Sequence, residues 1–136
     1  MDIEKTWILT DRQLCDCEMI LDGSFHPLDR FMTYDDYSCV LEDMRLYSGE
    51  LFPIPIVLDV TRQFSLELEI GENIILLNKE GYKIASMCVE SIWKPDLLDE
   101  ANTIYKTTDL THPAVRYLFN SSNKMYIGGK VKRIMI

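Results

Sequence analysis

The chain has 136 residues, 47% hydrophobic and 26% charged, and its 22 acidic residues against 14 lysines and arginines give a net charge of −8. This length and composition are typical of one globular domain with an adequate core, and they exclude collagen-like, coiled-coil and wholly disordered chains. The negative charge makes nucleic acid an unfavourable partner, because proteins that bind phosphates need clustered lysine and arginine. We therefore expect one domain over residues 1–136.

The charge is distributed unevenly along the chain. Residues 1–109 contain all 22 acidic side chains and nine basic ones, a net charge of −13, whereas residues 110–136 contain five basic side chains and no acidic one. Two interpretations stay open. The two signs occupy different solvated faces of one domain, or the basic end contacts an anion or an acidic partner surface.

Neither a signal peptide nor a membrane span is predicted. Charged residues follow Met1 almost at once, and no apolar run approaches the roughly 20 residues that a spanning helix needs. The four cysteines are Cys15, Cys17, Cys39 and Cys88. In a chain with an adequate core they do not suggest a disulfide framework. We expect a cytoplasmic protein with reduced thiols and no membrane contact.

Two helices are predicted in the first third of the chain. The first begins at Thr10, because Thr10 and Gln13 have the spacing of a capping box, and it ends before Gly23. Its apolar stripe is Leu14, Cys17, Ile20 and Leu21. After an unusually apolar loop over residues 24–28, a second helix begins at Thr33. Its predicted buried stripe is Tyr37, Val40, Leu41 and Met44.

The middle of the chain has the pattern of β-structure. Residues 52–60 are β-branched and apolar, with two prolines that make their start an edge or a strand entry. Residues 67–70 alternate between polar and apolar. Residues 73–77 and 82–89 are predicted to form a hairpin around the turn at residues 78–81.

Short helices and a final strand complete the prediction. Asp96 is suited to cap a helix that reaches about Tyr105, and Thr111 to cap a short one over residues 112–119. Residues 124–136 are strand-like, with a bend or bulge expected at Gly128 and Gly129. The predicted fold class is therefore α+β, built around a mainly antiparallel sheet or small barrel.

Each candidate for chemistry has a simpler structural explanation. Cys15 and Cys17 lack the two-residue gap of zinc and redox motifs. Gly128-Gly129-Lys130 lacks the remaining residues of a phosphate-binding loop, and its glycines are better explained by strand geometry. Thr107, Thr108, Asp109 and His112 offer hydroxyl, carboxylate and imidazole groups, but residues so close in sequence more often form turns and caps. No catalytic, cofactor-binding or metal-ligating residue is predicted.

A series of short motifs follows in order along nearly the whole chain. They are Leu9-Thr10-x-Arg12-Gln13-Leu14-Cys15-Asp16-x-Glu18, Gly23-x-Phe25-x-Pro27-Leu28-x-x-Phe31-Met32, Met44-Arg45-Leu46-x-x-Gly49, Pro53-Ile54-Pro55-Ile56-x-Leu58-Asp59-Val60, Pro95-Asp96, Glu100-Ala101, Thr107-Thr108-Asp109-x-x-His112-Pro113-x-Val115 and Gly128-Gly129-Lys130. Together they resemble the N-terminal, PUA-like domain of the ATP sulfurylases, also called sulfate adenylyltransferases. Lys106 and Ala114 stand where that family has glycine.

The resemblance implies a PUA-like α+β fold: a small, mainly antiparallel barrel or sheet with an N-terminal pair of helices and short interleaved helices. In this family ATP and sulfate react to adenylyl sulfate and pyrophosphate in a following α/β domain, marked by a Gln-x-Arg-Asn-Pro-x-His-x-x-His run. The present sequence lacks that run. We therefore expect a non-catalytic, cofactor-free domain that is inactive alone. The parent enzyme is expected to use ATP and Mg as its substrate complex. We also expect a naturally short form or a piece of a longer chain.

The resemblance further implies that the domain packs on the catalytic domain or a sibling subunit and supports subunit assembly. The expected contact residues are Phe25, Pro27, Leu28, Phe31, Met32, Lys130, Lys132 and Arg133. An alternative for the apolar loop is that it covers the domain's own core. Two other functions stay open: a stand-alone PUA-like module that binds RNA or protein, and an enzyme that uses Asp109, His112 and the nearby threonines.

Overall fold

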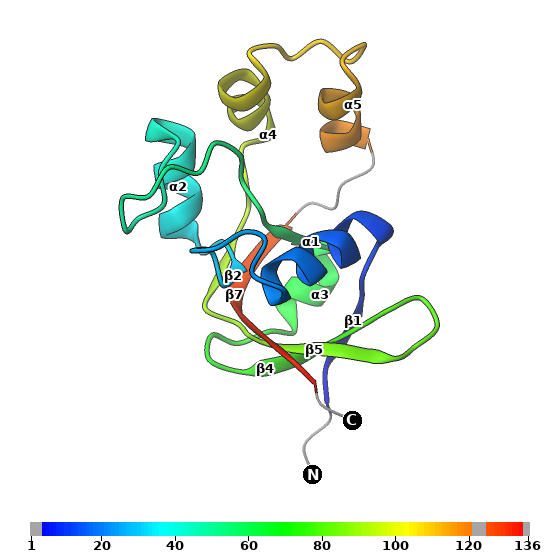
Figure 1. Ribbon diagram of the computed structural model, residues 1–136. Helices are drawn as coiled ribbons and strands as arrows, with labels where there is room; N and C mark the ends of the chain where they lie inside the picture. Colours follow the sequence, from blue (N-terminus) through cyan, green and yellow to red (C-terminus); the bar gives the residue numbers. More distant parts are fainter. Residues whose placement is uncertain (1–3, 121–124, 135–136) are drawn as a thin grey trace.

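The computed structural model describes residues 4–120 and 125–134, and within them the chain forms one curled sheet with α1 lying across it and further helices at one end (Figure 1). The strands are β1 Thr6–Ile8, β2 Arg30–Phe31, β3 Leu58–Val60, β4 Asn73–Leu77, β5 Lys83–Cys88, β6 Ser91–Trp93 and β7 Met125–Arg133. The helices are α1 Asp11–Leu21, α2 Tyr34–Asp43, α3 Arg62–Leu66, α4 Leu97–Glu100, the π-helix η1 Ala101–Tyr105 and α5 Pro113–Asn120. The predicted α+β class is confirmed.

Strand β7 is the centre of the sheet. The strand order is β1-β4-β5-β7-β2, and β3 and β6 also pair with β7. Only the β1–β4 pair among the described strands is parallel, with Trp7 opposite Leu76. All other pairs are antiparallel, as predicted; β4 and β5 are joined by a short turn, whereas the strands that pair with β7 lie far from it in the sequence.

Helix α1 forms where the capping box predicts it. The Thr10 Oγ1 atom accepts from the Gln13 backbone N–H at 3.2 Å, and Gln13 Oε1 accepts from the Thr10 N–H at 3.0 Å. Two of the unpaired N–H groups at the helix start are thereby satisfied. Gly23 follows the helix with φ of 84°, the left-handed conformation that ends many helices.

Helix α2 begins after Thr33, whose hydroxyl accepts from the Asp36 N–H, and it buries Tyr37 and Val40. The prediction that Met44 belongs to the buried stripe is wrong. The helix ends at Asp43, and Met44 adopts a left-handed φ of 53° with 54% of its surface exposed. The chain turns away at this residue, so the helical period no longer directs its side chain to the core.

The strand predicted over residues 52–60 is mostly wrong. Only β3 at its end joins the sheet, because Pro53 and Pro55 lack the N–H groups that a ladder needs. The alternating residues 67–70 are not a strand but lie in turns after α3, a short helix that Thr61 caps and that the sequence pattern did not predict. The β4–β5 hairpin is confirmed, whereas β6 was not predicted.

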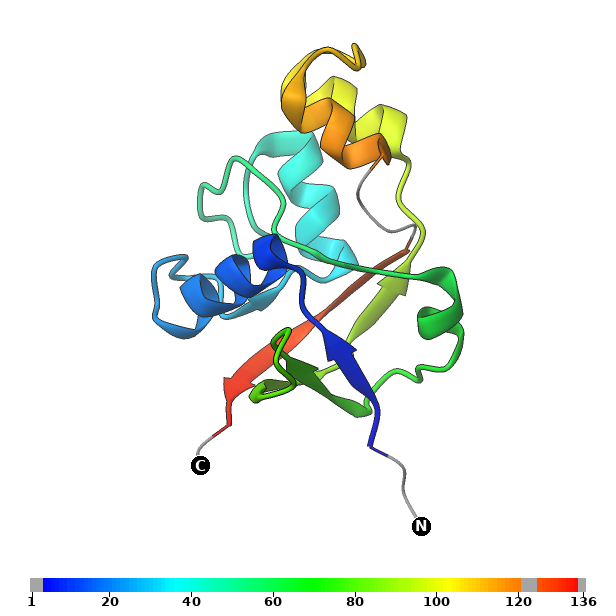
Figure 2. The same cartoon turned by 90° about the vertical axis from the view of Figure 1, so that its right-hand side faces the viewer.

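Helices α4, η1 and α5 form a small helical lobe, residues 97–120, at the end of the molecule away from the β4–β5 hairpin (Figure 2). Asp96 caps α4 as predicted, with its Oδ1 atom accepting from the Asp99 N–H at 3.1 Å. The cap of α5 is not Thr111 but His112, whose Nδ1 atom accepts from the Ala114 N–H at 3.2 Å. Lys106 ends η1 with φ of 59°, a conformation that glycine adopts more easily.

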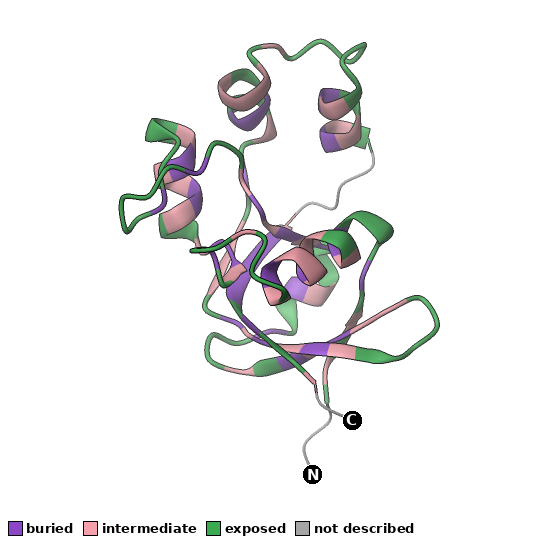
Figure 3. Cartoon of the chain, in the orientation of Figure 1, coloured by how far each residue is buried: buried purple, intermediate pink, exposed green. Residues whose placement is uncertain are grey.

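The core consists of two clusters of buried side chains (Figure 3). The larger one fills the curled sheet beneath α1 and α2, and the smaller one holds the helical lobe together through Ala101, Val115 and Leu118. None of the helices in the described part of the chain is long and apolar enough to span a membrane.

Gly128 and Gly129 let β7 pass between two neighbouring backbones. A Cβ atom at Gly128 would lie 1.9 Å from the carbonyl oxygen of Met32, and one at Gly129 would lie 1.7 Å from that of Cys88. Both distances are far below van der Waals contact, and backbone atoms on both sides cannot move independently. The glycines therefore serve close packing of the strand, which refines the predicted bend or bulge.

We predict that Gly129→Ala lowers the free energy of unfolding by about 3 kcal/mol or more, because the added methyl overpacks fixed backbone. The matched control is Gly81→Ala, where a Cβ meets nothing within 4 Å but φ is +89°. The control should lose only the left-handed penalty of about 1–2 kcal/mol. Urea unfolding followed by circular dichroism measures both variants, and equal losses would contradict the close-packing explanation.

Candidate functional site

The strongest polar site is a buried carboxylate, Glu100, at the end of α4. Its residue surface is only 4% exposed. The hydroxyls of Tyr37 and Tyr126 both donate to its Oε1 atom, at 2.5 and 2.9 Å. One carboxylate thus joins three elements: α2, the helical lobe and the central strand β7.

The electrostatics of this cluster follow from its burial. Burial raises the pKa of Glu100 above its ordinary value, and the two tyrosine hydrogen bonds oppose that rise. Burial, reinforced by the charge of Glu100, also raises the pKa values of Tyr37 and Tyr126. Both phenols therefore remain neutral donors over the physiological pH range.

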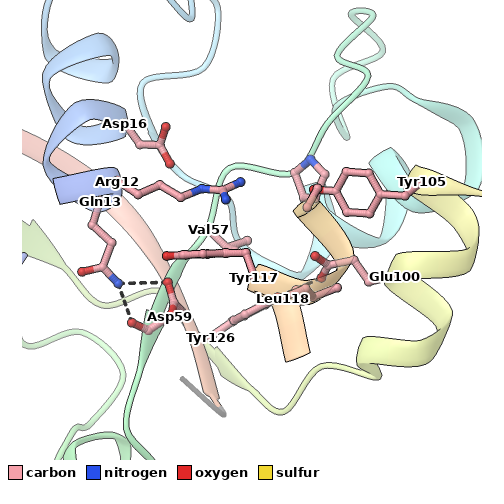
Figure 4. A pocket seen from close by; sticks show the side chains of 12 residues that line it. Arg12, Gln13, Asp16, Val57, Asp59, Glu100, Tyr105, Tyr117, Leu118 and Tyr126 are labelled. Atoms are coloured by element: carbon pink, nitrogen blue, oxygen red, sulfur yellow. Dashed lines mark hydrogen bonds between the residues drawn. The ribbon is translucent and has the colours of Figure 1, made fainter. Parts of the chain in front are cut away.

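A small polar pocket adjoins this cluster, between α1, the segment that leads into β3 and the helical lobe (Figure 4). The Arg12 guanidinium lies 4.5 Å from the centre of the Tyr117 ring, a cation–π contact that joins α1 to α5. Asp16 also lines the pocket. Burial raises the pKa of Asp16 above its ordinary value, and the positive charge of Arg12 opposes part of that rise.

Gln13 forms the floor of the pocket and is fully hydrogen-bonded. Its Nε2 atom donates to the carbonyl oxygen of Asp59 at 2.7 Å and to Asp59 Oδ1 at 2.9 Å. Its Oε1 atom accepts from the indole of Trp7 at 2.9 Å as well as from the Thr10 N–H. A buried amide with all its partners in place positions α1 against β1 and β3.

The pocket is too small for a nucleotide. Its volume is about 50 Å³, and drug-sized ligands occupy roughly 300–1,000 Å³. Within the described ranges, no group of three or more histidine, cysteine or acidic side chains is placed to hold a metal ion. The pocket has room for water. Its polar side chains form contacts within this chain and thereby connect the helices.

The catalytic candidates Thr107, Asp109 and His112 bind backbone groups of their own turn and helix start. Asp109 Oδ1 accepts from the Thr111 N–H at 2.9 Å, and the Thr107 hydroxyl accepts from the Asp109 N–H at 3.0 Å. His112 caps α5 through the acceptor atom that a general base would need. The cluster therefore has the turn and cap geometry that was the simpler explanation of this sequence.

The thiols of the four cysteines are free, as expected of reduced cysteines. Cys17 is completely buried, and burial raises its pKa to about 12, which keeps the thiol protonated and unreactive. Cys15 is exposed on the same helix, and Cys39 and Cys88 are half-buried rather than core residues.

Most of the apolar residues expected to contact another domain lie inside this one. Leu28, Phe31 and Met32 are buried in the larger core cluster, so for them the alternative of covering the domain's own core describes the structure. Phe25 is half-buried against Phe52, with ring centres 5.9 Å apart. Pro27 is exposed.

The basic contact candidates lie on β7 beside acidic side chains. Lys130 Nζ is 4.0 Å from Asp29, and the Arg133 guanidinium is 3.3 Å from Glu18. Lys132 is exposed. Two of these three basic side chains, Lys130 and Arg133, are thus paired with acids from the first 30 residues.

Sequence reasoning did not identify Glu100 as a site. A carboxylate four residues after a helix cap is expected on a solvated face, and its two tyrosine partners come from residues 63 and 26 positions away. The one available signal was the Glu100-Ala101 motif of the family resemblance.

Comparisons with known proteins address the whole chain. A family model described as a PUA-like domain matches residues 3–135. The sulfate adenylyltransferase of Schizosaccharomyces pombe is 43% identical over 129 residues, which are 93% of this chain and 26% of that relative. The corresponding protein of Kluyveromyces lactis is 40% identical over 131 residues, and that of Saccharomyces cerevisiae is 41% identical over 130. The chain spans about a quarter of the length of these relatives.

The fold also occurs in a solved structure. A hexameric APS kinase from Thiobacillus denitrificans aligns with a TM-score of 0.71 at 22% identity, over 96% of this chain and 21% of that one. At this identity the likeness describes the fold and nothing more.

We predict that the stability difference between the unmodified chain and Glu100→Gln depends on pH. Because the folded pKa of Glu100 lies above its unfolded value, the folded chain binds this proton more tightly. Protonated Glu100 therefore contributes its full stability at pH values below the ordinary pKa of a carboxyl group. This contribution declines as the pH rises toward the raised pKa of the folded state. The variant lacks this decline, which has a limit of about 1.4 kcal/mol per pH unit.

Urea unfolding from pH 4 to 8 measures the difference, with exposed Glu80→Gln as the matched control. The other acidic side chains titrate in both proteins, so their effects cancel in the stability difference. A gain of the unmodified chain over Glu100→Gln as pH rises would contradict the raised pKa.

Proposed function

The chain belongs to the PUA-like domain family, as its resemblance to the ATP sulfurylases predicted, and from this membership we propose that it serves as the non-catalytic domain of a sulfate adenylyltransferase. The observation that carries the proposal is the 40–43% identity with three such enzymes over more than nine-tenths of this chain. In this proposal the domain acts in sulfate activation in the cytoplasm. Chemistry on ATP and sulfate belongs to the remaining part of the enzyme.

The geometry of the polar clusters supports a non-catalytic role. The carboxylate of Glu100, the amide of Gln13 and the imidazole of His112 each bind groups of this chain. Their hydrogen-bonding capacity holds helices and turns together. ATP and its Mg ion are accordingly proposed as ligands of the catalytic part, and this domain contributes by packing against it or against a sibling subunit.

The segment between α2 and β3 offers the best surface for that packing. We call residues 44–54 the 44–54 loop. Its large exposed side chains are Met44 at 54%, Tyr47 at 74%, Leu51 at 64% and Ile54 at 48%. Exposed apolar side chains gathered in one segment are typical of a protein-binding surface.

The backbone of the 44–54 loop is fixed before any partner binds. The Tyr47 N–H donates to Asp36 Oδ1 at 2.9 Å, and the Leu46 N–H donates to the Glu50 carbonyl at 2.8 Å. Arg45 and Leu51 also form a β-bridge. A fixed loop loses little conformational entropy on binding, which favours association.

An RNA-binding role has less support. Lys130 and Arg133 on β7 lie beside Asp29 and Glu18, and the chain as a whole carries a net charge of −8. A surface that grips phosphates needs uncompensated lysine and arginine. Fold likeness to other PUA-like domains does not by itself supply that function.

We predict that the double variant Tyr47→Ser/Leu51→Ser weakens association with a separately expressed catalytic part of the S. pombe relative by about 30-fold or more, because truncated hot-spot side chains cost about 2 kcal/mol or more. Isothermal titration calorimetry measures the affinity. The matched control is Leu66→Ser/Tyr82→Ser, which removes similar exposed side chains, 74% and 66% exposed, from other surfaces. Absence of association, or equal weakening by both variants, would contradict the proposed packing.

A second measurement tests the non-catalytic role. The chain alone is expected to release no pyrophosphate from ATP and sulfate above background, because nothing in its described polar clusters is arranged to activate a nucleophile. Sustained release by the purified chain, lost on Glu100→Gln or His112→Ala, would overturn the assignment.

A further inference from the structure

A second pocket lies between α2, on the side of this helix that carries Tyr37 and Leu41, and the segment that leads from β6 into α4. Its volume is about 320 Å³, several times that of the pocket beside Gln13. Aromatic rings form one part of its wall and carboxylates the other. The lining residues that matter here are Tyr34, Tyr37, Trp93, Glu42, Asp96 and Asp99, and we call them the aromatic–acidic pocket.

The rings of the aromatic wall pack against one another. The Trp93 ring centre lies 5.8 Å from that of Tyr34, at 75°, and 5.4 Å from that of Tyr37, at 49°. The Tyr37 hydroxyl is held by Glu100, so only its ring is offered to the pocket. Tyr34 is 52% exposed, and its backbone N–H donates to Ser91 Oγ at 3.2 Å. Preformed ring faces of this kind attract cations through their quadrupoles.

The carboxylate wall makes the pocket electronegative. Glu42, Asp96 and Asp99 border it, and Lys94 is the one basic residue among its lining residues. The charges of Asp99 and Asp96 contribute to the raised pKa of Tyr37, after burial and Glu100, so their field extends over the aromatic wall. The net charge of −8 adds an attractive field for a cation at longer range.

The chain itself shows which cation suits such a site. At the smaller pocket the Arg12 guanidinium lies over the Tyr117 ring at 4.5 Å, and Asp16 lines the same space. A guanidinium is planar, stacks on aromatic rings and donates two parallel hydrogen bonds to a carboxylate. An ammonium is more strongly hydrated and gains less from the same surroundings.

We propose that the aromatic–acidic pocket binds the guanidinium group of an arginine side chain presented by a partner polypeptide. The guanidinium stacks on Tyr34 and Trp93 and pairs with Asp99 and Glu42. This role does not depend on the proposed membership in a sulfate-activating enzyme, since it rests on Tyr34, Trp93 and the surrounding carboxylates alone. The site would recognise a basic segment of whichever protein this domain contacts.

The test is a titration of the whole chain with the peptide acetyl-Gly-Arg-Gly-amide, followed through the indole N–H resonance of Trp93. A Trp7→Phe variant distinguishes this resonance from the other tryptophan's. We expect a saturating shift of the Trp93 resonance. The corresponding lysine peptide should bind more weakly, and free arginine, whose carboxylate is repelled by Asp99 and Glu42, more weakly than the arginine peptide.

Two variants separate the pocket from general charge attraction. Tyr34→Leu and Asp99→Asn should each lower the affinity for the arginine peptide by about 3- to 30-fold. This is the range expected when a cation–π or partly buried charge contact is lost. The controls Tyr82→Leu, at a tyrosine 66% exposed on another surface, and Glu80→Gln should leave the affinity unchanged. No saturating shift of Trp93, equal affinity for arginine and lysine peptides, or equal effects of variants and controls would each overturn the proposal.

Discussion

The path of β7 through the sheet is the constraint on which the other elements depend. This one strand pairs with β2, β3, β5 and β6, so residues from the start, middle and end of the chain meet on it. It can do so only because Gly128 and Gly129 carry no side chain where Met32 and Cys88 backbones approach. Tyr126 on the same strand then reaches Glu100 and fixes the helical lobe. This hydrogen bond therefore joins the central strand directly to the lobe.

Local signals predicted the elements whose cause is local. The capping box at Thr10, the cap at Thr33 and the turn between β4 and β5 depend on neighbouring residues, and all three form as expected. The failures have a non-local cause. Residues 52–57 have the apolar composition of a strand, but their prolines leave them beside the sheet without a ladder. Residues 67–70 alternate in sequence but lie in turns, where Leu68 is buried and Ile70 is 63% exposed, so the two do not share one buried face.

The candidate site was less predictable than the fold, because burial decides its chemistry. Glu100 becomes a structural carboxylate only when Tyr37 and Tyr126 arrive from distant positions. Phe31 and Met32 have the composition of an interface but fill the core, while Tyr47 and Leu51, which belong to no recognisable sequence pattern, are exposed. Composition gives the number of apolar side chains, and tertiary packing decides which of them stay outside. Tertiary packing also determines what the uneven charge does. Lys130 and Arg133 on β7 lie beside Asp29 and Glu18 from the first 30 residues.

Amide hydrogen exchange tests the central claim, that this chain is a preformed domain whose role is to pack on a catalytic part. The exchange rates of the chain alone are compared with those in the presence of the catalytic part of the S. pombe relative. The account predicts slowed exchange in the 44–54 loop, at Tyr47 and Leu51 above all, with the β4–β5 turn unchanged. Unchanged exchange throughout, or slowing confined to that turn, would contradict it.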